Sequence, residues 1–169
     1  RCPSGAARRV SAAAPAVLPR RPALLESDRA RFMGGPFSRQ DSWFWIASEV
    51  GSWELKGFGS WGVETHDGTF LGQLGVNQPE HFPEIEIGWV FLEAAEGKGY
   101  AFEAATAVLD WVRRDLRPPS LVSYIHTDNH RSIALARRLG ATQDVTAAMA
   151  AGDTPEDTVV YRHRVEAPA

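Results

Sequence analysis

The sequence predicts a single domain of the mixed α/β (α+β) class, and three observations lead to that prediction. Its 169 residues, 44% of them hydrophobic, suit one domain with a substantial core. Apolar residues recur at helical spacing in three segments and at alternate positions in several others. The resulting order is helix, three strands, helix, strand, helix, strand, which contains at least one β-α-β crossover.

The first helix is expected from Ser38 to Val50, where apolar residues fall along one face. Ser38 is a candidate N-cap, and Asp41 follows it at the spacing of a capping pattern. Gly51 is expected to end this helix. Two strands should then follow around a reversal at residues 66–68, which read His-Asp-Gly.

The third strand is predicted in "EIEIGWVFL", residues 84–92, which alternates between two faces. One face carries Glu84 and Glu86, and the other carries three apolar side chains. The strongest helix of the chain is predicted over residues 98–114, where six apolar residues keep helical spacing. Pro118 prevents its continuation.

Three further elements complete the chain. "SLVSYIH", residues 120–126, is predicted as a strand, and "NHRSIALARRL", residues 129–139, as a helix stopped by a glycine. The closing strand is "DTVVYRHRV", residues 157–165. Its Arg162 and His163 are expected on the surface.

The uneven charge of the chain excludes some functions. Residues 1–23 contain five arginines and no acidic residue, and are interpreted as a poorly ordered or atypical leader, with an organelle transit peptide as the alternative. Residues 24–169 form the predicted domain, which holds all 21 acidic residues. This acidity argues against a nucleic-acid surface and suits an amine-bearing substrate. No apolar run could span a membrane, and the single Cys2 cannot form an internal disulfide, so a cytoplasmic location is expected.

The stretch "EGKGYAFEAA", residues 96–105, places two glycines directly before a predicted helix. Such a loop exposes backbone N–H groups in front of the positive end of the helix dipole, which makes an anion site suited to phosphate. A tight turn without a ligand explains the glycines equally well. The spacing fits neither a Rossmann fingerprint nor a P-loop.

Three segments together resemble the GCN5-related N-acetyltransferase (GNAT) family. Residues 96–101 resemble its acetyl-CoA pyrophosphate loop, [QR]-x-x-G-x-[GA], except that Glu96 stands at the first position. Residues 129–141 resemble its second cofactor segment, and residues 84–91 resemble its splayed central strand. The forms "E-I-G-W" and "N-x-x-S" are most similar to the RimJ/RimL branch, which acetylates protein N-termini.

The resemblance implies a mostly antiparallel sheet that opens into a V between two parallel strands, flanked by helices. Acetyl-CoA would enter the V, with pantetheine along Val90, Phe91 and Leu92 and its arm held by Asn129. No metal is implied. The backbone amides expected to hold the pyrophosphate belong to Gly97, Lys98, Gly99, Tyr100 and Ala101.

Acetyl transfer needs a proton acceptor for the amine and stabilisation of the departing thiolate. The resemblance makes Glu86 the first candidate for the base, through water, and Glu84 the second. Ser132 would hydrogen-bond the thiolate, because Ala136 stands where many members carry a tyrosine. A solvated strand face and a first-turn helix serine are the structural alternatives for these residues.

The sequence thus predicts an acetyl-CoA-dependent N-acetyltransferase that acts on a protein N-terminus or a small amine. A non-catalytic acyl-CoA sensor or interaction domain is the alternative. The family's usual first strand is not evident in residues 1–30, and the sheet edge so exposed would favour a homodimer.

Overall fold

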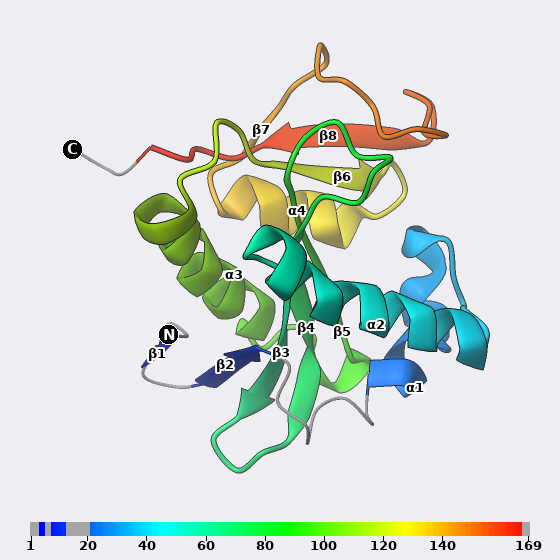
Figure 1. The fold of residues 1–169 in the computed structure, drawn as a ribbon, viewed down its shortest axis with the longest axis vertical. Coiled ribbons are helices and arrows are strands. Elements are labelled where there is room, and N and C mark those ends of the chain that lie inside the picture. Colours follow the sequence, from blue (N-terminus) through cyan, green and yellow to red (C-terminus); the bar gives the residue numbers. More distant parts are fainter. Residues whose placement is uncertain (1–3, 6–7, 13–20, 167–169) are drawn as a thin grey trace.

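The computed structural model describes residues 4–5, 8–12 and 21–166 (Figure 1). Both helices and strands occur along these residues, as the mixed α/β prediction requires. The strands are β1 (Ser4–Gly5), β2 (Arg8–Ala12), β3 (Ser60–Thr65), β4 (Phe70–Asn77), β5 (Glu86–Phe91), β6 (Val122–His126), β7 (Thr142–Gln143) and β8 (Thr158–Arg162). The helices are α1 (Arg21–Leu25), η2 (Asp28–Met33), α2 (Arg39–Lys56), η3 (Glu93–Ala95), α3 (Tyr100–Trp111), η4 (Val112–Leu116) and α4 (His130–Arg138).

The described strands form one sheet in the order β1-β2-β3-β4-β5-β6-β8-β7. Its pairs are antiparallel apart from β5 and β6, which run parallel and meet in register at one position, Glu86 with Val122. In Figure 1, β5 runs downward from this point while β6 runs across the top of the molecule. The mostly antiparallel, V-shaped sheet that the resemblance implied is therefore confirmed.

Helix α2 begins where the sequence predicted but ends later. The Ser38 hydroxyl accepts the Asp41 amide N–H at 3.1 Å, which confirms the cap. The predicted end at Gly51 is wrong, because α2 runs on to Lys56 and is capped by Gly57 at φ 76°. One glycine costs a helix only about 1 kcal/mol, and packing of the last turns against the core offsets this.

The first strand that the sequence did not reveal is present. Residues 8–12, within the predicted leader, form β2 and pair antiparallel with β3 from Arg8–Thr65 to Ala12–Trp61. The edge of β3 is thus covered within the chain, which removes the argument from a free edge for a homodimer. The rest of the predicted leader up to residue 20, except residues 4–5, lies outside the described residues.

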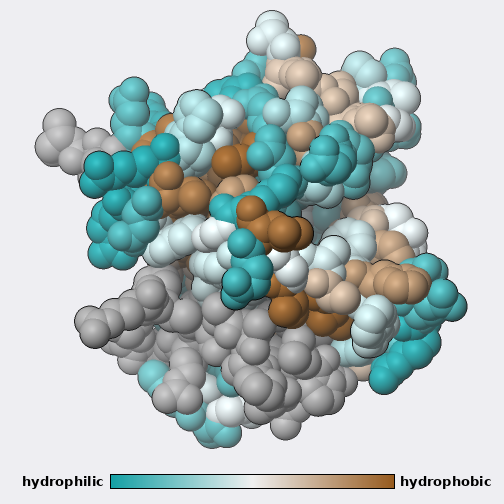
Figure 2. Space-filling model, viewed as in Figure 1, coloured by the Kyte–Doolittle hydropathy of each residue, from teal (hydrophilic) through white to brown (hydrophobic). Residues whose placement is uncertain are grey.

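The main core lies between the sheet and α3. Trp61 of β3, 2% exposed, meets Trp53 at 4.9 Å and Trp111 at 5.1 Å, both nearly edge-on. These contacts join the last turns of α2 and α3 to the sheet. The outer side of α2 also carries exposed apolar side chains, including Trp43 and Phe44, and Figure 2 shows apolar patches over this helix.

None of the helices in the described ranges is both long enough and apolar enough to cross a membrane.

Candidate active site

The two parallel strands separate immediately after they meet. The Val122 amide donates to the Ile85 carbonyl at 2.9 Å. At the next residue of β6, the hydrogen bond to β5 comes from the Ser123 side chain and not from the backbone. The Ser123 hydroxyl donates to the Ile87 carbonyl at 2.6 Å and lies 3.0 Å from His163 Nε2. The apex of the V is therefore fixed by a buried side-chain link between β5, β6 and the end of β8.

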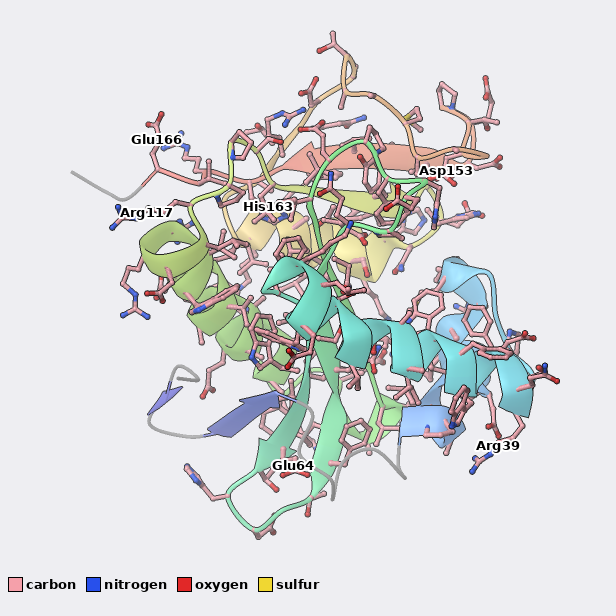
Figure 3. All side chains as sticks on the ribbon, in the orientation of Figure 1. Arg39, Glu64, Arg117, Asp153, His163 and Glu166 are labelled. Atoms are coloured by element: carbon pink, nitrogen blue, oxygen red, sulfur yellow. The ribbon has the colours of Figure 1, made fainter. Side chains whose placement is uncertain are left out.

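His163 is buried, so its predicted surface position is wrong. It is 4% exposed and follows β8 beside the apex (Figure 3). Burial, with a smaller effect of the Arg113 charge, lowers the His163 pKa to about 4, so the ring is neutral at pH 7. Because the Ser123 hydrogen is used on Ile87, Nε2 is the nitrogen that donates to the serine.

Glu86 lies on the face of β5 opposite Ile87, at the apex. A Cβ added to Gly88 would stand 3.4 Å from the Glu86 Oε1, so the carboxylate leans over bare backbone. Burial raises the Glu86 pKa to about 7; the Tyr124 backbone N–H opposes this rise and the charge of Asp153, labelled in Figure 3, adds to it. A carboxylate that is half ionised near neutral pH can accept a proton in catalysis.

Glu84 stands in a different environment. Its two oxygens accept Arg162 Nη1 and Nη2 at 2.7 and 3.0 Å, while Arg162 Nε donates to Asp144 at 2.7 Å. The hydrogen bonds from Arg162 keep the Glu84 pKa below its ordinary value. Sequence alternation placed both glutamates on one face, but this pairing gives Glu84 a structural role and leaves Glu86 as the better proton acceptor.

Tyr124 lies beside the candidate base Glu86, and the sequence reasoning did not single it out. It lies on β6 with its ring 5.0 Å from that of Phe82, and its buried hydroxyl has no acceptor for its hydrogen. Burial, followed by the charge of Glu84, raises the Tyr124 pKa to about 12, so it remains a hydrogen-bond donor. Within "SLVSYIH" only the strand alternation distinguishes this residue, which is too weak a signal to identify it.

Ser132 lies on the other face of the V, in the first turn of α4. Its hydroxyl oxygen accepts Trp89 Nε1 at 3.1 Å, and its amide donates to Asn129 Oδ1 at 3.2 Å. Because the hydroxyl oxygen acts as the acceptor in this contact, its hydrogen is available for another hydrogen bond. Trp89 alternates with Glu86 along β5, so the two candidate catalytic groups, Glu86 and Ser132, flank the opening from opposite faces.

The glycine loop lies between η3 and α3. Gly97 and Gly99 have φ of 69° and 79°, a backbone conformation that favours glycine. A Cβ added to either would meet nothing within 4 Å, so the space in front of the backbone is open. Open amides at the start of a 12-residue helix fit a pyrophosphate group.

Glu96, the residue that departs from the family pattern, is held by two arginines. One carboxylate oxygen accepts Arg29 Nη2 from η2, and the other accepts Arg131 Nη1 from α4. Burial would raise the Glu96 pKa, but Arg29 and then Arg131 bring it below its ordinary value. The loop is thus tied to elements on both sides of the V.

Beyond the apex, every second residue of β5 points its backbone N–H and C=O groups away from β4, into the V. Arg29 Nε donates to the Phe91 carbonyl at 2.9 Å, whereas the Leu92 amide donates to Leu71 on the β4 side at 2.9 Å. Backbone N–H and C=O groups of alternate residues point to the same side of a strand, so Val90, which pairs with Gln73, points toward β4 as Leu92 does. Of the three residues predicted to accompany pantetheine, Phe91 therefore directs its backbone N–H into the V.

Comparison with known proteins shows which family the chain resembles. Residues 12–142 match the model of the acetyltransferase (GNAT) domain. The chain belongs to the GNAT family. It is 33% identical to an acetyltransferase from Agrobacterium tumefaciens strain C58, with a TM-score of 0.87 over 95% of this chain and 92% of that one.

Further matches cover relatives of known sequence or structure. The Bacillus subtilis protein YkkB is 37% identical over 90 residues, 50% of this chain and 52% of YkkB, so the chain spans about half the length of that curated relative. The Salmonella typhimurium acetyltransferase of ribosomal protein L7/L12 shares 19% identity at a TM-score of 0.74, covering 94% and 95% of the two chains. Spermidine N-acetyltransferase from Vibrio cholerae, solved with CoA and spermine, shares 14% at 0.70, covering 92% of each.

Proposed function

We propose that this GNAT chain transfers an acetyl group from acetyl-CoA to a primary amine by direct attack in a ternary complex. The observation that carries the proposal is the pair of groups on opposite faces of the V. Glu86 lies on one side with a raised pKa, and Ser132 lies on the other, next to Arg131, which contacts Glu96 of the glycine loop. Acceptor and cofactor would thus reach the reacting carbon from different sides.

The residues have distinct roles in this proposal. The amides from Gly97 to Ala101 would hold the pyrophosphate, and the Asn129 side-chain N–H groups would donate to the pantetheine arm. Bound acetyl-CoA supplies the activated acetyl group and a thiolate leaving group. Glu86 takes the proton that the amine loses as its nitrogen bonds to the acetyl carbon, and Ser132 donates to the sulfur as the C–S bond breaks. The Phe91 N–H is the backbone donor for the oxyanion.

The acceptor is proposed to be a protein N-terminal α-amine or a small-molecule amine. An α-amine titrates near ~8 and a lysine near ~10.4, so presenting a lysine as free base costs roughly 3 kcal/mol more at the same pH. The L7/L12 and spermidine enzymes illustrate the two acceptor classes on this fold.

Release of free CoA thiol tests the proposal. The full chain is incubated with acetyl-CoA and, in separate arms, N-terminal peptides, polyamines and monoamines. We expect amine-dependent thiol release in at least one arm, reduced about 100-fold in Glu86→Gln and retained in Glu84→Gln. Binding of acetyl-CoA by calorimetry without turnover on any amine would instead establish a non-catalytic acyl-CoA-binding domain.

A further inference from the structure

Glu96 brings a negative charge to a loop that otherwise suits an anion. It directly precedes Gly97, and its two oxygens are each used by a different arginine. A carboxylate at this place would repel a bound pyrophosphate if it acted alone. The effect of Glu96 on a bound pyrophosphate therefore depends on the two arginines that neutralise its charge.

The two arginines are not equivalent. Arg29 is 31% exposed and also donates to the Phe91 carbonyl, so it is fixed at both ends of its guanidinium. Arg131 is 78% exposed, and its guanidinium reaches across from the first turn of α4 to Glu96. An exposed ion pair of this kind is weak and easily exchanged for another anion.

Arg131 is also well placed to meet such an anion. A pyrophosphate on the Gly97–Ala101 amides would lie beside Glu96, because that residue directly precedes the first glycine. The Arg131 guanidinium already contacts Glu96, so rotation of the Arg131 side chain would bring it to the pyrophosphate. Guanidinium binds phosphate oxygens with paired hydrogen bonds, as it binds a carboxylate.

We propose that Glu96 and the pyrophosphate of CoA compete for Arg131, so that Glu96 lowers CoA affinity and takes the arginine back when the product leaves. This inference rests on the proposed function, since CoA is the ligand. Arg29 stays on Glu96 and Phe91 in both states and keeps the loop in place. Glu96 thus adjusts the affinity for CoA, while the loop amides supply most of the binding.

Calorimetric titration with CoA tests the competition and needs no acceptor amine. We expect Glu96→Gln to bind CoA about fivefold more tightly, because the competitor and its charge are both removed. Arg131→Ala should bind about twofold more weakly in the natural background and about tenfold more weakly beside Glu96→Gln, where nothing competes for the arginine.

Two controls separate the competition from general charge and from folding. Glu93→Gln removes the same charge from an exposed position three residues earlier and should change CoA affinity less than twofold. Pantetheine, which lacks phosphates, should bind the natural chain and all variants alike. Thermal unfolding without ligand establishes that each variant is folded, and the exposed Arg131→Ala is the variant least able to disturb the fold.

The sign of the change in Glu96→Gln decides the outcome. Weaker or equal CoA binding would overturn the competition and assign Glu96 to holding the loop, and equal binding by Arg131→Ala in both backgrounds would overturn the role of the arginine. Failure of the natural chain to bind CoA at all would refute the proposed function itself. These results are distinguishable in one set of titrations.

Discussion

The two faces of the splayed strand β5 are constructed differently. On the side that carries Trp89 and Ser132, the proposed cofactor face, the φ angles of the glycine loop and the Asn129 cap of Ser132 are local features, although distant arginines hold Glu96 at the start of the loop. On the side that carries Glu86, the proposed acceptor face, one buried carboxylate of α2 joins the helix to two strands of the sheet. Buried Glu49 of α2 accepts Trp45 Nε1 at 2.9 Å, Ser60 Oγ at 2.8 Å and Gln73 Nε2 at 3.1 Å.

This difference indicates how the two faces tolerate change. A site made of backbone amides depends on a few φ angles, and most side chains around it can vary. A face held by one buried carboxylate depends on that carboxylate, because removing it strands several donors at once. Single substitutions are therefore expected to disturb the proposed acceptor face more than the glycine loop.

The largest effect is expected from breaking the acceptor-face network. Glu49→Ala leaves three donors without their acceptor and should lower the free energy of unfolding by about 3 kcal/mol. Urea unfolding followed by tryptophan fluorescence measures this. Glu54→Ala, an exposed glutamate on the same helix, should change it by less than about 0.5 kcal/mol. Equal losses in both variants would contradict the network.

Removing the proposed base tests the acceptor face chemically. Glu86→Gln should lower kcat/KM about 100-fold. In the natural chain, kcat/KM should rise with pH through about 7, because the raised pKa leaves Glu86 protonated below that value and ionised above it. Tyr124 and Asp153 face this carboxyl from β6 and from the loop before β8. A rise that persists in Glu86→Gln would assign the titration to another group.

The cofactor face should show a smaller effect that depends on one φ angle. Gly99→Ala forces alanine into φ 79°, which costs about 1 kcal/mol, so CoA affinity should fall about fivefold. Gly51→Ala is the matched control, since Gly51 lies within α2 with open space around it. The same change there should stabilise the fold by about 0.5 kcal/mol. Unchanged CoA affinity in Gly99→Ala would count against the loop.

The smallest effect is expected at the leaving group. Ser132→Ala should lower kcat about threefold with little change in the acceptor KM, because a serine hydroxyl stabilises a thiolate without protonating it. Steady-state rates of thiol release measure both parameters. A change in KM alone would place Ser132 in binding instead.

Much of the fold follows from patterns within single segments. The Ser38 cap, the strand alternation around Glu86 and the reversal at residues 66–68 are decided by neighbours, and the structure confirms them. Two local predictions failed. Gly51 did not end α2, because tertiary packing outweighs a weak helix breaker, and β2 escaped notice because five residues paired with a distant strand leave little periodicity.

The sequence by itself determined where the glycine loop lies, which residues share the faces of β5, and which family the segments resemble. Only the tertiary structure distinguished the surroundings of Glu86 from those of Glu84, placed His163 in the interior and showed which arginines hold Glu96. Each of these depends on groups far away in the chain, such as Arg162 for Glu84 and Arg29, 67 residues from Glu96. Charge and desolvation act through space, so residue identity and spacing cannot set them.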